Sequence, residues 1–201
     1  MKILGLTGGI ACGKSTISQT LRQEGAYIVD GDELSRRLTA PGGAALPAIR
    51  ERFGNHVFQA DGTLDRCALG QRVFADGAAR QALDDVMQPL LRQLILEEIG
   101  AARAAGVSLC VLDMPLLYEK ELDTLCDRVW CAWLPHNEQL ARLMARDGFT
   151  AQEAESRIAS QLPVDEKAAR ADIVIDTSGS IQYTKEKVLA LLAQETDTLH
   201  P

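Results

Sequence analysis

Short apolar runs along the chain alternate with longer segments in which apolar residues recur every three or four positions. The short runs predict strands, at residues 2–7, 26–29, 107–112, 128–134 and 172–175. A helical pattern at about 14–24 separates the first two runs, and strand–helix–strand order favours parallel strands with right-handed crossovers. The pattern therefore predicts an α/β fold with a mostly parallel five-stranded sheet.

Residues 33–106 contain no convincing strand and several helical patterns. These patterns lie at about 33–38, 44–53, 65–74 and 78–105. Pro89 lies inside the last one, which predicts a kink or a break into two helices. Asp61-Gly62 predicts a turn between two short extended pieces. We interpret this region as a helical insertion packed against the sheet.

The C-terminal part of the chain predicts three more helices. They lie at about 136–146, 150–160 and 181–195. Thr150 and Glu153 match a capping box at the start of the second helix.

The strongest chemical signal lies between the first strand and the first helix. Gly8, four further residues and then Gly13-Lys14-Ser15 form the phosphate-binding P-loop pattern in its strand–loop–helix context. Backbone N–H groups at a helix N-terminus can surround phosphates. Lys14 is suited to the β- and γ-phosphates and Ser15 to Mg²⁺. The complete pattern favours nucleotide binding over an ordinary glycine-rich turn.

Two carboxylates follow the second strand. Asp30 and Asp32 would face the same way if the segment is extended, so both are expected to point into one pocket. One of them is suited to orienting the proton of an attacking hydroxyl. The alternative is that one caps the helix expected to begin at Glu33. Arg36 lies one helical turn after Asp32 and is expected to approach the same pocket.

Other charged residues supply weaker candidates. Asp113 closes the third strand, as does the acidic residue that holds the Mg²⁺ hydration shell in P-loop proteins. Arg142 and Arg146 share a helix face and Arg157 follows on the next helix, which suits a lid that closes over ATP. The alternative is surface pairing of these arginines with Glu138, Glu153 or Glu155. Arg66 is a candidate anion contact from the helical insertion.

Composition excludes some classes of function. The net charge of −7 argues against a nucleic-acid-binding surface. The five cysteines form no Cys-x-x-Cys pair, which favours a reducing compartment over a disulfide framework. No signal segment or membrane span is apparent. We therefore expect a soluble cytoplasmic protein, with no membrane partner.

Taken in order, these motifs resemble the dephospho-coenzyme A kinase family over nearly the whole chain. The most specific matches are Leu6–Ile10 with Gly13–Thr16, Asp30-Gly31-Asp32 with Arg36, Asp61–Arg66, Pro115-Leu116-Leu117-Tyr118-Glu119 and Ala171–Asp176, with Gln139, Arg142, Arg146, Arg157 and Gln161 between the last two.

The resemblance implies a three-layer P-loop NTPase sandwich with two additions. The core would comprise residues 1–32, 107–134 and 166–201, the acceptor-substrate domain 33–106 and the lid 135–165. The implied reaction is ATP- and Mg²⁺-dependent phosphorylation of the ribose 3′-hydroxyl of dephospho-coenzyme A. Its products are coenzyme A and ADP, in the last step of coenzyme A biosynthesis.

The resemblance also implies roles for individual residues. Asp32 would be the base or orienting group, with Lys14 as the second catalytic residue, and Ser15 and Asp113 would hold Mg²⁺. The other nucleotide contacts would come from Gly9, Ala11, Cys12, Gly13, Thr16 and Arg142. The acceptor contacts would come from Asp30, Asp32, Arg36, Arg66, Leu116 and Glu119.

The chain departs from the family pattern at a few positions. Ala11 and Cys12 stand where glycine and serine are usual, Gln88 replaces a histidine, and Thr177 replaces a common asparagine. The residues alone lead only to a small-molecule kinase, so a kinase for another nucleoside or nucleotide remains an alternative. A nucleotide-dependent regulatory switch is a second alternative, although the chain lacks the Asn-Lys-x-Asp guanine motif. We expect a monomer or a weak homo-oligomer.

Overall fold

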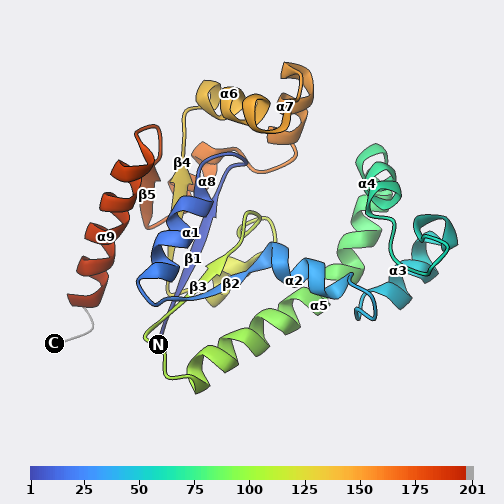
Figure 1. The fold of residues 1–201 in the computed structure, drawn as a ribbon, viewed down its shortest axis with the longest axis horizontal. Helices are drawn as coiled ribbons and strands as arrows, with labels where there is room; N and C mark the ends of the chain where they lie inside the picture. Colours follow the sequence, from blue (N-terminus) through green and yellow to red (C-terminus); the bar gives the residue numbers. More distant parts are fainter. Residues whose placement is uncertain (198–201) are drawn as a thin grey trace. The chain divides into compact units, whose positions relative to one another are not determined.

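A five-stranded parallel sheet forms the centre of the first of two compact units. The computed structural model describes residues 1–197, and the strand order is β2-β3-β1-β4-β5 (Figure 1). The strands are β1 (Lys2–Gly8), β2 (Tyr27–Asp30), β3 (Leu109–Asp113), β4 (Arg128–Trp133) and β5 (Ile173–Asp176). The predicted α/β fold with a parallel sheet is confirmed.

The central position of β1 decides what lies beside the P-loop. On one side Leu6 is in register with Asp113 of β3, and on the other Gly8 is in register with Ala132 of β4. Because parallel strands end at the same edge of a sheet, the loop after β1 lies between the segments that follow β3 and β4.

Two helices cover one face of this sheet. The helices α1 (Lys14–Gln23) and α9 (Ile181–Asp197) contact each other. Ile17 of α1 and Val188 of α9 are fully buried in one apolar cluster with Leu6 of β1. Alternate residues of a strand point to opposite faces, so the same face also includes Leu4 and excludes Thr7.

The helix α8 (Val164–Arg170) lies over the opposite face and was missing from the predicted elements. Thr7 Oγ1 and Lys167 Nζ donate hydrogen bonds to the same carbonyl, Pro115 O, at 3.2 and 2.7 Å. The segment is short, and its most buried side chain is a lysine that is 0% exposed. A hydrophobic pattern cannot reveal a helix whose buried face carries a charge.

The remaining helices of this unit form a pair after β4. They are α6 (His136–Asp147) and α7 (Ala151–Ile158), and the 3-10 helix η2 (Leu122–Leu125) precedes β4. The predicted capping box is present: Thr150 Oγ1 accepts a hydrogen bond from Glu153 N while the Glu153 carboxylate accepts one from Thr150 N.

Residues Asp30–Ala101 form the second compact unit. Its helices are α2 (Gly31–Leu38), α3 (Leu46–Phe53), η1 (Asn55–Val57), α4 (Arg66–Ala75) and α5 (Gly77–Ala104), of which the end of α5 belongs to the first unit. Ile49 and Val57 are fully buried in its apolar cluster. An isolated antiparallel bridge joins Phe58 to Leu64, which confirms the turn predicted at Asp61-Gly62.

Of the two outcomes predicted for Pro89, a kink or a break, the break is wrong. The helix α5 is continuous from Gly77 to Ala104 with Pro89 inside it, although its ribbon changes direction along its length (Figure 1). Apolar residues on both sides of the proline, including Val86 and Leu90, pack against the same cluster. This packing offsets the cost of the hydrogen bond that proline removes.

In the described part of the chain, no helix is long and apolar enough to span a membrane.

We predict that Lys167 is essential for stability. Lys167 Nζ also lies 2.7 Å from Glu119 Oε1, so Lys167→Met would leave a largely buried carboxylate without its cation. The free energy of unfolding, measured by urea denaturation, should fall by about 3 kcal/mol. Lys185→Met, on the partly exposed side of α9, is the control and should change stability little. The double variant Lys167→Met/Glu119→Met should recover much of the loss. A loss in Lys167→Met as small as in the control would contradict this account.

Candidate active site

The P-loop, Gly8–Ser15, is shaped by contacts that exclude larger residues. A Cβ atom on Gly8 would lie 2.7 Å from Ala132 O on the neighbouring strand. Gly13 is the N-cap of α1 and has left-handed angles, φ 73° and ψ 17°. Ala11 also has a positive φ, 61°, which is strained for a residue with a side chain. Geometry therefore explains the glycines at positions 8 and 13, whereas Ala11 is a strained exception.

Lys14 forms an ion pair with Asp113. Lys14 Nζ contacts Asp113 Oδ1, and their side chains are 18% and 7% exposed. The register of β1 with β3 places this carboxylate beside the P-loop. The two residues that the sequence assigned to phosphate and to Mg²⁺ therefore lie in direct contact.

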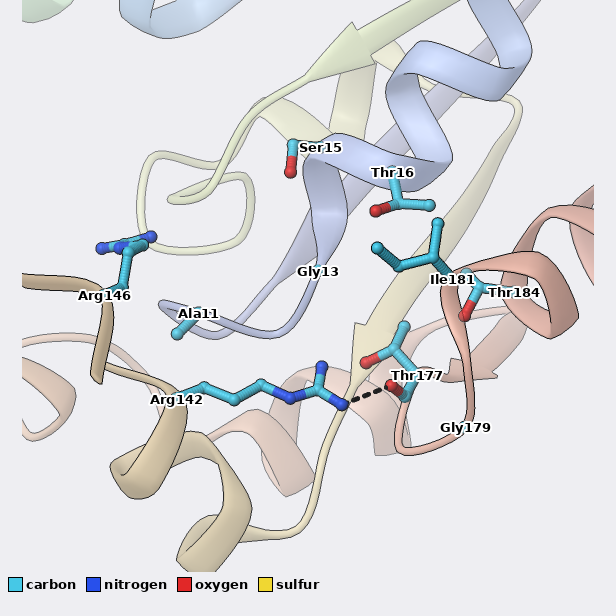
Figure 2. Close-up of a pocket in the computed structure, with 10 residues that line it drawn as sticks. All are labelled: Ala11, Gly13, Ser15, Thr16, Arg142, Arg146, Thr177, Gly179, Ile181 and Thr184. Carbon is cyan, nitrogen blue, oxygen red and sulfur yellow. Dashed lines mark hydrogen bonds between the residues drawn. The ribbon is translucent and has the colours of Figure 1, made fainter. Parts of the chain in front are cut away.

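A cavity of about 370 Å³ opens beside the P-loop. Figure 2 shows Ser15 and Thr16 at the start of α1 and Ile181 and Thr184 on α9. The cavity is lined by Ala11, Gly13, Ser15, Thr16, Arg142, Arg146, Thr177, Gly179, Ile181 and Thr184. Its volume lies in the range typical of small-molecule sites.

Arg142 extends from α6 across this cavity. Arg142 Nη2 donates a hydrogen bond to Thr177 O at 2.8 Å (Figure 2). Thr177 Oγ1 lies 3.0 Å from Cys12 O and 3.1 Å from Trp133 O. The threonine in the place of the family's usual asparagine thus contacts the P-loop backbone.

The other two arginines of the predicted lid have local partners. Arg146 donates hydrogen bonds from Nε and Nη2 to the two carboxylate oxygens of Asp147, each at 2.8 Å. The Arg157 guanidinium lies 4.2 Å from the centre of the Phe149 ring. Glu153 is used by the capping box, and Glu155 lies 3.1 Å from His136. Arg142 and Arg146 line the cavity, whereas Arg157 does not.

The thiol of Cys12 points away from the cavity. Its side chain is 1% exposed and belongs to the apolar cluster that includes Leu6 and Trp130. Burial raises the pKa of this thiol to about 11, so it stays protonated at neutral pH. Cys12 therefore contributes its backbone to the P-loop and lacks the thiolate that oxidation requires.

In the second unit, Asp30 and Asp32 have different surroundings. Asp30 Oδ1 accepts hydrogen bonds from Asp32 N at 2.9 Å and Glu33 N at 3.1 Å, so it is the N-cap of α2. Asp32 lies in the first turn of this helix and is exposed. The expectation that both lie on an extended segment and face the same way is wrong, because N-capping starts the helix one residue after Asp30.

Arg36 and Arg66 also belong to this unit. Arg36 is exposed on α2, one turn after Asp32. Arg66 Nη2 donates hydrogen bonds to Thr39 Oγ1 at 2.8 Å and Arg36 O at 3.4 Å. These contacts join the start of α4 to the end of α2 and place the Arg66 guanidinium beside the Arg36 backbone.

Glu119 is occupied within the first unit. Its Oε1 atom lies 2.7 Å from Lys167 Nζ and 3.0 Å from Leu162 N. Leu116, in the same segment after β3, is half-buried. The carboxylate assigned to substrate thus holds the α7–α8 connection and the buried lysine.

Three comparisons with known proteins place the chain. A family model described as dephospho-CoA kinase matches residues 2–183. A dephospho-CoA kinase from Anaeromyxobacter dehalogenans is 48% identical over 193 residues, which cover 96% of this chain and 92% of that protein. The chain belongs to the dephospho-CoA kinase family.

Solved structures agree with this assignment. The crystal structure of TT1252 from Thermus thermophilus is similar with a TM-score of 0.82 and 32% identity, over 96% of this chain and 97% of that one. Dephospho-CoA kinase from Campylobacter jejuni is similar with a TM-score of 0.74 and 25% identity, over 98% and 99% of the two chains. The resemblance noted from the sequence motifs is confirmed as dephospho-CoA kinase family membership.

Two residues of this dephospho-CoA kinase family member were assigned no role from the sequence. Lys167 gave no signal, because a lysine in a short polar segment is normally exposed. Gln139 is 2% exposed and donates from Nε2 to Ile10 O at 2.8 Å. Gln139 was noted only as a match to the family pattern. Its spacing of four from the fully buried Leu143, which places both on the inner face of α6, is a second signal.

We predict that the strain at Ala11 can be relieved. Ala11→Gly should raise the free energy of unfolding by about 1 kcal/mol, because glycine adopts positive φ without the side-chain clash. Thermal and urea denaturation would measure the change. Ala190→Gly, on the exposed face of α9, is the matched control and should lower stability by about 1 kcal/mol. Equal losses in both variants would contradict strain at Ala11.

Proposed function

We propose that this chain transfers the γ-phosphoryl group of ATP to the ribose 3′-hydroxyl of dephospho-coenzyme A. Coenzyme A and ADP are the products. The observation that carries the proposal is 48% identity to a named dephospho-CoA kinase over 96% of the chain, with the P-loop intact. The chemistry of the residues around the P-loop supports it.

The nucleotide binds in the cavity beside the P-loop. Backbone N–H groups at the start of α1 and the Lys14 ammonium hold its phosphates. Residues Gly9, Ala11, Cys12, Gly13 and Thr16 complete the cradle. Arg142 is the lid arginine suited to the transferring group, because its guanidinium already reaches across the cavity. In this proposal α6 and α7, within residues 135–165, form the lid.

The residues near Lys14 also fit a magnesium ion. The Ser15 hydroxyl lines the cavity, and the Asp113 carboxylate lies against Lys14, so a hydroxyl and a carboxylate oxygen are available beside the phosphates. Mg²⁺ prefers such oxygen ligands and keeps several waters. When bound, the ion neutralises charge on the phosphates. Ser15 and Asp113 would hold it, directly or through water.

The acceptor binds to the unit Asp30–Ala101. Asp32 is the carboxylate suited to receive or orient the proton of the attacking hydroxyl, because Asp30 uses its own carboxylate as a cap. The cap fixes the start of α2 and therefore the position of Asp32. Arg36 and Arg66 supply positive charge for the acceptor's phosphates. Leu116 is an apolar contact, and Glu119 supports the segment that carries Leu116.

A kinase for another nucleoside or nucleotide is the alternative with the same P-loop chemistry. The test is ADP release from ATP and Mg²⁺ with dephospho-coenzyme A, adenosine or AMP as acceptor. We expect release with dephospho-coenzyme A and formation of coenzyme A. Release driven by AMP or adenosine would overturn the substrate, and release indifferent to acceptor would favour a regulatory switch.

We predict that Asp32→Asn lowers kcat at least a hundredfold, because an amide cannot take up the hydroxyl proton. The affinity for ATP, measured by calorimetry, should stay within about twofold, since P-loop contacts are intact. Glu33→Gln is the control, an equally conservative change to the next exposed carboxylate of α2. Near-normal turnover by Asp32→Asn would remove the proposed role of this aspartate.

A further inference from the structure

A phosphate-binding loop must turn its carbonyl oxygens away from its ligand. Phosphates are anionic and accept hydrogen bonds from N–H groups, whereas a carbonyl oxygen pointing at them would repel them. The question for the P-loop is which groups hold its carbonyls in place.

The carbonyls of Gly9, Ile10, Cys12 and Gly13 all accept hydrogen bonds, that of Gly13 from Thr16 N at 3.0 Å. Cys12 N donates to Gly9 O at 3.1 Å, within the loop itself. Gln139 Nε2 donates to Ile10 O at 2.8 Å, and Thr177 Oγ1 donates to Cys12 O at 3.0 Å. The carbonyls of Ile10 and Cys12 are therefore held by side chains from outside the loop.

The buried amide of Gln139 costs stability although it makes only one hydrogen bond. The side chain is 2% exposed, and its Oε1 atom is buried with no hydrogen-bond partner among the described residues. An unpartnered buried carbonyl oxygen destabilises a protein. Methionine fills a similar volume without that cost. The amide therefore has a purpose other than filling the core.

The same helix contacts the loop a second time, by an indirect path. Arg142 lies three residues after Gln139 on α6 and donates to Thr177 O, and Thr177 donates to Cys12 O. The helix that carries the lid arginine is thus joined to both halves of the loop. A shift of α6 would move the Ile10 carbonyl and the Arg142 guanidinium together.

We propose that Gln139 is a positioning residue that sets the P-loop carbonyls for phosphate binding and links the loop to α6. The inference rests on the proposed function, because it assigns the loop to the phosphates of ATP. It predicts that changes at Gln139 alter phosphate affinity more than they alter stability.

Gly9 gives the contact a second, independent signature. A Cβ atom on Gly9 would lie 2.5 Å from Gln139 Nε2, so the amide fills the space above this glycine. Gly9→Ala should therefore displace Gln139. Shortening Gln139 at the same time should relieve the clash.

The first test is Gln139→Met. The dissociation constant for Mg-ATP, measured by calorimetry, should rise about tenfold, because the Ile10 carbonyl loses its donor. The melting temperature should change by no more than a few degrees, and KM for the acceptor should stay unchanged. Gln93→Met removes an amide–carboxylate hydrogen bond on exposed α5 and is the matched control. Inorganic triphosphate should show the same loss of affinity as ATP.

The second test is a double-mutant cycle. Gly9→Ala should weaken Mg-ATP binding more than Gln139→Ala does, and the double variant should bind better than Gly9→Ala alone. Unchanged affinity in Gln139→Met, or strictly additive effects in the cycle, would overturn the proposal. A wild-type chain that binds neither ATP nor triphosphate would instead overturn the proposed function.

Discussion

The parallel pairing of β1 with both β3 and β4 is the constraint on which the rest of the site depends. This pairing sets Leu6 beside Asp113 and Gly8 beside Ala132. The loop after β1 therefore begins between the Asp113 carboxylate and the backbone of Ala132. The space at position 8 admits only glycine. Lys14 of the same loop contacts Asp113 directly. The chemistry of the cavity is therefore a consequence of strand register.

Local signals in the sequence located the elements that carry the most regular patterns. The strands, the P-loop and the Thr150 capping box all follow from short-range rules that the structure obeys. Asp30 was ambiguous because a carboxylate after a strand suits a cap and a catalytic site equally, and backbone N–H groups decided the matter. Pro89 does not break its helix, as one of its two predicted outcomes required, because tertiary packing outweighs the local preference.

The contacts of residues whose role depends on a distant partner could not be found from sequence, even where the residue matched a family motif, as Gln139 did. The burial of Lys167 depends on its contacts with Glu119 and the Pro115 carbonyl, and the sequence around Lys167 predicts neither contact. Gln139 needs the Ile10 carbonyl, far away along the chain. Both are polar side chains at buried positions, where a hydrophobic pattern is silent. The predicted charged residues were easier because the P-loop pattern and the carboxyl ends of parallel strands mark positions where charged groups meet a ligand.

The inward orientation of Cys12 joins two properties that are usually treated apart. Its backbone belongs to the nucleotide-binding loop, while its side chain belongs to the apolar cluster that includes Trp130 and Ala132. We therefore expect substitutions deep in that cluster to shift the loop without contacting the cavity. Core packing and nucleotide affinity are thereby coupled through Cys12, so we expect substitutions that affect the two to be non-additive.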